Sequence, residues 1–175
     1  MKRYIILLRG LMPTGKNKVL MAPLRQVLVD AGFLDVRTYI QSGNVLARSA
    51  LTRAQVEGLV HDQIEKHFGG DIVVVARTSL QVRQIFADNP FQDSDTATVY
   101  FTILGSRPSK EKIKLLAGQT FLPDTFVVTS EAVYIHSPVA YGITKLNNNF
   151  VERTLGVSAT TRNYRTMKKL IELSV

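Results

Sequence analysis

Two hairpin patterns lie 88 residues apart in this chain, about half of its 175 residues. The first turns at Ser42-Gly43 and the second around Ser130-Glu131. An apolar strand pattern and then a helical pattern precede each hairpin, and a helix and an extended segment follow it. This repeated order predicts an internal structural duplication.

The first half opens with the apolar run Tyr4–Leu8, which reads as a central strand because both of its alternating faces are apolar. Further along, Thr52 and Gln55 have the spacing of a capping box that starts a helix. The predicted elements of this half are strand 3–9, helix 21–31, hairpin strands 35–41 and 44–48, helix 52–67, strand 72–76 and helix 79–87.

The second half is expected to repeat this order, with strand 98–104, helix 109–117, hairpin strands 126–129 and 133–136, a largely helical segment 141–155, an extended piece 159–161 and helix 163–173. A split βαβ pair of this kind is the ferredoxin-like motif. The sequence therefore predicts an α+β fold, a tandem duplication of a ferredoxin-like βαββαβ unit with antiparallel sheets packed with helices. The expected halves are residues 1–87 and 88–175, as two domains or packed as one compact unit.

The strands of the first half have no polar face. Ile5 and Leu7 alternate with other apolar residues, as do Val73 and Val75. Helices cover one face of a ferredoxin-like sheet, and the other face would here be too apolar for water. We therefore expect these four side chains to be mostly buried, some of them under the other half of the chain or a second copy of it.

Charge is distributed unevenly along the chain, whose net charge is +8. Residues 1–50 carry eight Lys and Arg against two acidic residues, and residues 140–175 carry six against two, whereas the middle is slightly acidic. One interpretation is a solvated basic surface. The other is that both ends of the chain fold onto one positive face that attracts an anion.

Composition excludes several classes of protein. There is no cysteine, so disulfides and thiolate sites are absent. The apolar run at the start ends at Arg9, too short for a signal peptide, and no stretch approaches the length of a membrane span, so a cytoplasmic location is expected. No catalytic motif and no metal-binding spacing is present, so the sequence names no reaction and predicts neither a metal nor a cofactor.

The stretch between residues 9 and 18 has the composition of an anion-binding loop. Backbone N–H groups in a glycine-rich turn can surround an anion, and a helix start follows. It is not a P-loop, because position 17 is Asn rather than Ser or Thr. Simple anion contact and a purely structural turn both remain open for its candidate residues, Arg9, Gly10, Gly15, Lys16, Asn17 and Lys18.

Three further clusters are candidates for the same site. The hairpin around Ser42 could face a ligand, or its polar side chains could simply bond the turn backbone. The segments near residues 145 and 162 mix hydroxyl groups with cations just before predicted helices, where capping explains the hydroxyl groups but not the guanidinium. The residues concerned are Arg37, Gln41, Ser42, Asn44, Lys145, Thr161, Arg162 and Asn163.

Several of these stretches resemble the domain-of-unknown-function 1697 family, whose members are mostly bacterial. The matching segments are Leu8-Arg9-Gly10, Gly15-Lys16-Asn17-Lys18, Val36 to Val45, Leu155-Gly156-Val157 and Ala159 to Asn163. The resemblance covers essentially the whole chain and implies two tandem ferredoxin-like halves, but no activity, ligand or catalytic residue.

The chain departs from that family at two places. Met12-Pro13-Thr14-Gly15 stands where the family usually has Asn-Val-Gly-Gly, and Tyr164 where it often has Trp. Since Pro13 has no N–H to donate, we expect any family ligand to bind this loop less well or differently.

The sequence therefore leaves three possible functions open. The first is an anion-binding module that contacts nucleic-acid phosphates or a phosphorylated small molecule. The second is a structural or protein-interaction module without a ligand, and the third is an enzyme with an unrecognised polar site. Base stacking on the sheet is disfavoured, because the segment Ser42–Arg48 lacks the aromatic residues of an RNA-recognition strand.

Overall fold

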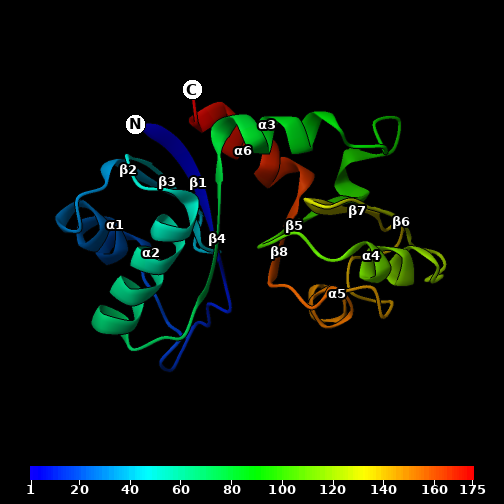
Figure 1. The fold of residues 1–175 in the computed structure, drawn as a ribbon, viewed down its shortest axis with the longest axis horizontal. Helices are drawn as coiled ribbons and strands as arrows, with labels where there is room; N and C mark the ends of the chain where they lie inside the picture. Colours follow the sequence, from blue (N-terminus) through cyan, green and yellow to red (C-terminus); the bar gives the residue numbers. More distant parts are fainter. The chain divides into compact units, whose positions relative to one another are not determined.

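The computed structural model describes residues 1–175, which form two compact units (Figure 1). Unit 1 consists of Met1–Val82 together with Leu170–Val175, and unit 2 of Arg83–Lys169. The last six residues of the chain therefore belong with its first half. The division into domains at residue 87 stays a prediction.

Unit 1 contains a four-stranded antiparallel sheet with strand order β2-β3-β1-β4. The hairpin β2–β3 lies at one edge of the sheet, and β1 lies between β3 and β4. The elements are β1 (Lys2–Arg9), α1 (Met21–Asp30), β2 (Leu34–Tyr39), β3 (Asn44–Ser49), α2 (Arg53–Phe68), β4 (Val73–Thr78) and the start of α3 (Ser79–Ala87).

Unit 2 contains a second four-stranded antiparallel sheet, with strand order β6-β7-β5-β8. Its hairpin occupies the same place in the strand order as the hairpin of unit 1, which is consistent with a duplicated unit. The elements are η1 (Thr96–Thr98), β5 (Val99–Leu104), α4 (Lys110–Ala117), β6 (Thr125–Val128), β7 (Ala132–His136), α5 (Asn148–Leu155), β8 (Ala159–Asn163) and α6 (Tyr164–Leu173). The fold is thus α+β, as the sequence predicts.

Local sequence signals set several element ends. Thr52 caps α2, and Thr52 and Gln55 form the predicted capping box. Gly69 ends the same helix in the left-handed conformation, at φ +72°. The predicted hairpin turn at Gly43 also has a positive φ, of +86°.

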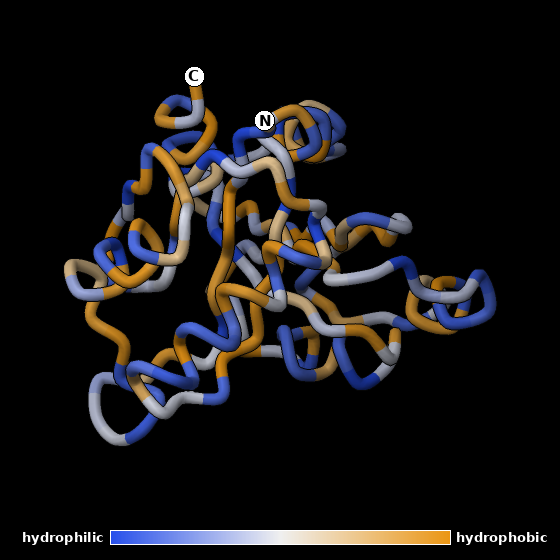
Figure 2. The backbone as a smooth tube through the Cα atoms, turned by 60° about the vertical axis from the view of Figure 1, so that its left-hand side comes forward, coloured by the Kyte–Doolittle hydropathy of each residue, from blue (hydrophilic) through white to orange (hydrophobic).

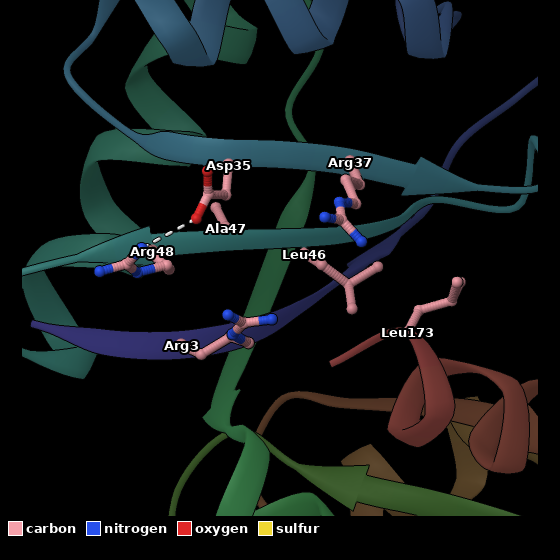
Figure 3. Close-up of a pocket in the computed structure, with 7 residues that line it drawn as sticks. All are labelled: Arg3, Asp35, Arg37, Leu46, Ala47, Arg48 and Leu173. Atoms are coloured by element: carbon pink, nitrogen blue, oxygen red, sulfur yellow. Dashed lines mark hydrogen bonds and ion pairs between the residues drawn. The ribbon is translucent and has the colours of Figure 1, made fainter. Parts of the chain in front are cut away.

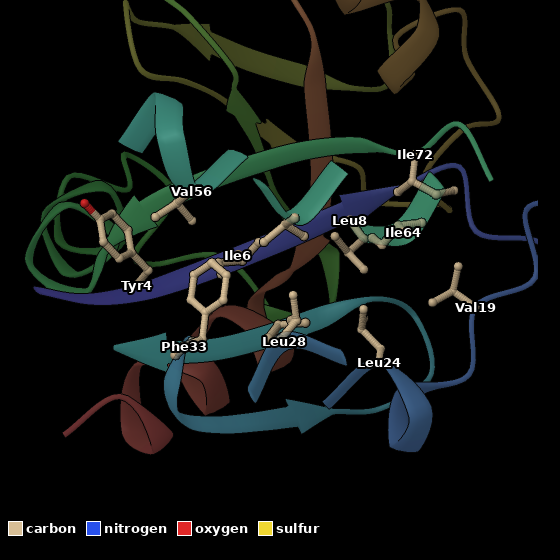
Figure 4. Packing of buried hydrophobic residues seen from close by; sticks show 14 of the residues in the cluster. Tyr4, Ile6, Leu8, Val19, Leu24, Leu28, Phe33, Val56, Ile64 and Ile72 are labelled. Carbon is tan, nitrogen blue, oxygen red and sulfur yellow. The ribbon is translucent and has the colours of Figure 1, made fainter. Parts of the chain in front are cut away.

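The core of unit 1 lies between the sheet and the helices α1 and α2 (Figure 4). Tyr4, Ile6 and Leu8 project from one face of β1 and pack against Leu28 and Ile64. All five side chains are buried, and this face follows from the two-residue alternation of a strand. The first sheet face is therefore covered by helices of its own unit.

The other face of the sheet, called the second face below, is also apolar at its centre. Ile5, Leu7 and Val75 are buried, as predicted, whereas Val73 is half-buried. Coverage of this face by the other half or by a second copy stays a prediction. Hydrophobic residues follow the strands and hydrophilic residues gather in the loops (Figure 2). None of the helices is long and apolar enough to span a membrane.

The predicted helical segment 141–155 is wrong over its first half, because α5 begins only at Asn148. The preceding loop is held by the buried carboxylate of Asp124. This carboxylate accepts hydrogen bonds from Ser137 Oγ at 2.7 Å and from Thr144 Oγ1 at 2.6 Å. Gly142 has a φ of +86°, which a helix does not allow. A long-range contact thus overrides the local helical pattern.

Candidate anion-binding sites

The loop between β1 and α1, residues 10–20, is closed by its own backbone. The N–H of Met12 donates to the carbonyl of Asn17 at 2.9 Å, and the N–H of Lys18 donates to that of Gly15 at 3.1 Å. Gly10 and Gly15 have φ values of +91° and +77°, so the glycines supply left-handed turns. The result is an ordered loop rather than an open tether.

One of the predicted loop residues, Asn17, anchors the loop to the rest of unit 1. Asn17 Oδ1 accepts a hydrogen bond from the N–H of Asp71 at 3.2 Å, at the start of the segment that leads into β4. Arg9 is half-buried at the end of β1 and takes part in a polar or charged contact of its own. Asn17 therefore has a structural role.

The hairpin turn after β2 packs against this loop. A Cβ atom at Gly43 would lie 2.7 Å from Leu11 Cδ1, so glycine permits the close approach. Gln41 Nε2 donates to the carbonyl of Val19 at 2.6 Å. The structure thus brings together the two motifs of unit 1 that the sequence singled out.

The polar side chains of this turn are used within it. Asn44 Nδ2 donates to the carbonyl of Tyr39 and to Ser42 Oγ, both at 3.0 Å. Asn44 is fully buried. For Gln41, Ser42 and Asn44 the structural interpretation therefore accounts for the side chains, since their hydrogen bonds fix the turn and the loop.

The helix that follows the loop has an unusual start. Its N-cap residue is Leu20, which has no side-chain oxygen to bond the first turn. The N–H groups of Met21 and Ala22 have no hydrogen-bond partner, and the third helical residue is Pro23, which has no N–H. The other five helices all have a polar side-chain cap, from Thr52, Thr78, Ser109, Asn147 and Asn163.

The two lysines of the loop lie close to this helix start in the sequence. Lys16 and Lys18 are exposed, and neither side chain makes a hydrogen bond or an ion pair. Because a helix N-terminus carries a partial positive charge, the lysines and the helix start both favour an anion.

Arg37 does not belong to this end of the unit. It lies in β2 opposite Leu46, which in turn lies opposite Ile5, so Arg37 is on the second face. There it lines a small pocket with Arg3, Arg48, Asp35, Leu46 and Leu173 (Figure 3). The pocket has a volume of about 10 Å³, which is room for one water-sized atom.

Three guanidinium groups and a single carboxylate line this pocket, which we call the arginine pocket. Arg48 Nη1 lies 3.0 Å from Asp35 Oδ2, and Arg3 Nη1 donates to the main-chain oxygen of Val175, the last residue. Arg37 has neither a hydrogen bond nor an ion pair. Sequence reasoning missed Arg3 and Arg48, because only the strand register brings them to Arg37.

The remaining candidates lie in unit 2, and two of them point to opposite faces of its sheet. The Thr161 hydroxyl lies 2.8 Å from Thr102 Oγ1 and 3.1 Å from the Tyr141 hydroxyl, on the face that packs against α5. Arg162, the next residue in β8, points to the other face, and Thr161 therefore does not share a surface with it.

Arg162 bonds to its own strand. Its Nη1 atom donates to Thr160 Oγ1 at 2.7 Å and to the carbonyl of Thr161 at 2.9 Å. Burial lowers the pKa of its guanidinium to about 10. These contacts explain the arginine without a ligand.

Asn163 and Lys145 have different surroundings. Asn163 caps α6 by accepting a hydrogen bond from the N–H of Thr166 at 2.8 Å, and Lys145 lies in the loop before α5. Asn163 also lines an open groove of about 300 Å³ with Thr96, Ala97 and Arg165. No group of three or more acidic or histidine side chains gathers in either unit to hold a metal ion.

Comparisons with known proteins support the fold and the family. A conserved bacterial protein, SP0830 from Streptococcus pneumoniae, has a similar structure, with a TM-score of 0.78 and 21% sequence identity over 99% of both chains. None of the curated proteins matches the chain. A family model described as "Protein of unknown function (DUF1697)" matches residues 1–134. Since this match covers most of the chain, the protein belongs to the DUF1697 family.

Proposed function

We propose that this protein is an anion-binding module, and that one site is the start of α1 together with the loop that precedes it. The ligand is a phosphorylated small molecule whose phosphate group binds the free N–H groups of Met21 and Ala22. Lys16 and Lys18 supply the countercharge.

The observation that carries this proposal is the absence of a side-chain cap on α1. Leu20 stands where five other helices of the chain have Thr, Ser or Asn. A polar N-cap stabilises a protein by about 1 kcal/mol relative to an apolar one. In those five helices the cap bonds the N–H of the third helical residue, which in α1 is Pro23 and has none. The remaining N–H groups at this positive helix end, which two exposed lysines precede, are therefore open to an external anion.

The contribution of unit 2 is a separate part of the hypothesis. The sequence groups Lys145, Arg162 and Asn163 with the loop on one positive surface, and this grouping stays a prediction. The proposed site uses only residues of unit 1, so it does not depend on Lys145, Arg162 or Asn163. Contact with nucleic-acid phosphates is an outcome to be tested.

We also infer that each half is ferredoxin-like. The order β1-α1-β2-β3-α2-β4 and the sheet order β2-β3-β1-β4 support this assignment, as do the matching orders in the second half. In unit 1 the loop site lies where the first strand ends and the first helix begins.

The test is a two-dimensional NMR titration with inorganic phosphate at low ionic strength, which follows each backbone N–H separately. In the wild type we expect the Met21 and Ala22 signals to shift. The double variant Lys16→Gln/Lys18→Gln should bind phosphate at this site roughly tenfold more weakly, as expected for losing charged partners. The matched control is Lys110→Gln/Lys114→Gln, which removes two exposed lysines from unit 2 and should bind like the wild type.

Equal binding by the two double variants would refute the proposal, as would a wild type whose Met21 and Ala22 signals do not move. A single-stranded oligonucleotide in place of phosphate tests the nucleic-acid alternative. If it moves the same signals with much higher affinity, the ligand is a polyanion rather than a small molecule.

A further inference from the structure

The arginine pocket is a second cationic site, at a different place on unit 1. Arg3 lies six residues before Arg9 on β1, roughly 20 Å along the strand from the loop at about 3.3 Å per residue. The pocket opens on the second face of the sheet, at its β2–β3 edge (Figure 3). It is therefore independent of the site proposed at α1.

The strand register forces two like charges together in this pocket. Arg3 and Arg48 are direct cross-strand partners in the antiparallel pair β1–β3. Like charges in directly opposite positions destabilise a sheet. Arg37 adds a third guanidinium two positions along the neighbouring strand, opposite Leu46. A fold that needed only stability would place at least one neutral or acidic residue among these positions.

One acidic side chain partly offsets the charge. Asp35 is the only acidic residue among those that line the pocket, and its carboxylate bonds Arg48 at 3.0 Å. It reaches this position from a β-bulge, because the β2–β3 register shifts between Leu34 and Arg37 and Asp35 has a φ of +51°. Among the side chains that line the pocket, three guanidinium groups and one carboxylate sum to a charge of +2, and Arg3 also donates to the main-chain oxygen of Val175.

We propose that the arginine pocket binds the phosphate group of a phosphate monoester, and that the Asp35 carboxylate is an internal competitor which the ligand replaces at Arg48. A phosphate monoester carries a charge between about −1.5 and −2 at pH 7, opposite in sign to the summed charge of the lining side chains. A carboxylate offers one negative charge and two acceptor oxygens, whereas a phosphate group offers three oxygens to the three arginines. The planar forks of arginine are well suited to paired phosphate oxygens.

The size of the pocket limits what it recognises. A volume of about 10 Å³ admits one oxygen atom, so the other phosphate oxygens lie at the rim. Leu46, which is buried, and Leu173 provide an apolar wall that strengthens the charged hydrogen bonds. The organic part of the ligand projects into solvent, so the pocket selects the phosphate group and discriminates little between the molecules that carry it.

The test uses NMR titrations in the Lys16→Gln/Lys18→Gln background, in which phosphate binding at the proposed α1 site is weakened. The probes are inorganic phosphate, O-phosphoserine, adenosine monophosphate and acetate. We expect the three phosphates to shift the Arg37, Leu46 and Arg48 signals with similar affinities, and acetate to bind at least about tenfold more weakly. Acetate binding as tightly as phosphate would overturn the assignment of the ligand class.

Single variants then test the residues. Arg37→Gln should weaken phosphate binding roughly tenfold, since one charged hydrogen-bond partner is lost. Its matched control is Arg25→Gln, because Arg25 bonds Thr38 Oγ1 on the other face of the same strand and carries the same charge. Equal affinities for these two variants would overturn the site.

The variant Asp35→Asn tests whether Asp35 competes with the ligand for Arg48 or only holds Arg48 in position. Asn also tolerates the left-handed conformation at this position, so the substitution removes the charge with little effect on the backbone. If Asp35 competes with the ligand, phosphate should bind about threefold to tenfold more tightly. Unchanged or weaker binding would show that Asp35 only supports Arg48, and that the competitor role is wrong. Because the probed signals lie in the pocket and not at Met21 and Ala22, failure here leaves the α1 site untouched, and the reverse also holds.

Discussion

Arg3 on β1 and Arg48 on β3 lie directly opposite each other, so two guanidinium groups project from adjacent strands onto the same face of the sheet. Asp35 bonds Arg48, and the main-chain oxygen of Val175 accepts a hydrogen bond from Arg3. The stability of unit 1 therefore depends on how these neighbouring cations are neutralised.

Removing the Asp35 charge should lower stability while it improves phosphate binding. We expect Asp35→Asn to reduce the free energy of unfolding by about 0.5–1 kcal/mol at low salt, because the ion pair is exposed. At high salt the difference should shrink, since the repulsion between the arginines is screened. The double variant Asp35→Asn/Arg48→Gln should regain the loss. Thermal unfolding at two salt concentrations measures the stability of the wild type, of Asp35→Asn and of the double variant. An unchanged stability of Asp35→Asn at low salt would contradict the account.

The carboxylate of Asp124 should be essential for the loop of residues 137–147. Asp124→Ala removes the acceptor of two hydroxyl groups and leaves Ser137 and Thr144 without it, at a cost of roughly 2–4 kcal/mol. Urea unfolding measures the loss. Hydrogen exchange should show faster exchange in this loop, whereas the sheet of unit 1 should keep its protection. A loss below 0.5 kcal/mol, as for an ordinary surface change, would speak against this role.

Tyr134 should make the protein sensitive to alkali. Its hydroxyl donates to the carbonyl of Ile85 at 3.0 Å, and burial, followed by the negative charge of Asp88, raises its pKa to about 12. The folded pKa is therefore above the unfolded value of about 10. The stabilisation is complete below pH 10 and is lost as the pH rises from 10 to 12, because only the unfolded state ionises easily.

The matching variant is Tyr134→Phe. It should cost about 1 kcal/mol at pH 7 through the lost hydrogen bond. Between pH 10 and 12 its stability should fall less steeply than that of the wild type. Parallel curves for the two proteins in urea titrations across this range would refute the ionisation argument.

A substitution at Leu7 tests whether β1 is a buried central strand. It lies on the second face of β1, and only 1% of its surface is exposed. Leu7→Ala should cost roughly 2–5 kcal/mol, which combines lost burial and the cavity that remains. A measured loss well under 1 kcal/mol would show that the strand is not central.

The secondary structure was largely predictable because it rests on short-range signals. The alternation in Tyr4–Leu8, the capping box at Thr52 and the glycine at position 43 each act within a few residues. The helix expected from residue 141 failed for the opposite reason. Asp124 is 20 residues away from Thr144 in the sequence, and no local sequence pattern predicts that contact.

The candidate site was predictable only in part. The loop and the hairpin turn were recognised as motifs, but the turn's polar side chains bond the backbone nearby. The missing cap of α1 was visible in the sequence at Leu20. The arginine pocket was not, because it depends on the register of β1 against β3 and on the bulge at Asp35. Arg3, Arg37 and Arg48 are far apart in sequence and meet only in the sheet.

The proposed α1 site predicts one effect that a purely structural loop does not. If the helix start is left open for an anion, a side chain that caps it should stabilise the protein and block the ligand. Leu20→Ser supplies such a cap at an exposed position. It should raise the free energy of unfolding by up to about 1 kcal/mol, because the serine oxygen can bond the free N–H of Ala22, the second residue of the helix; Pro23, the third, has no N–H to bond.

The most direct measurement is therefore an NMR phosphate titration of the wild type and of Leu20→Ser, followed at Met21 and Ala22. The account predicts that phosphate shifts both signals in the wild type and that Leu20→Ser, though more stable, loses this response. A Leu20→Ser protein that gains stability and still binds phosphate at these signals as the wild type does, or a wild type that shows no shift, would contradict the central claim.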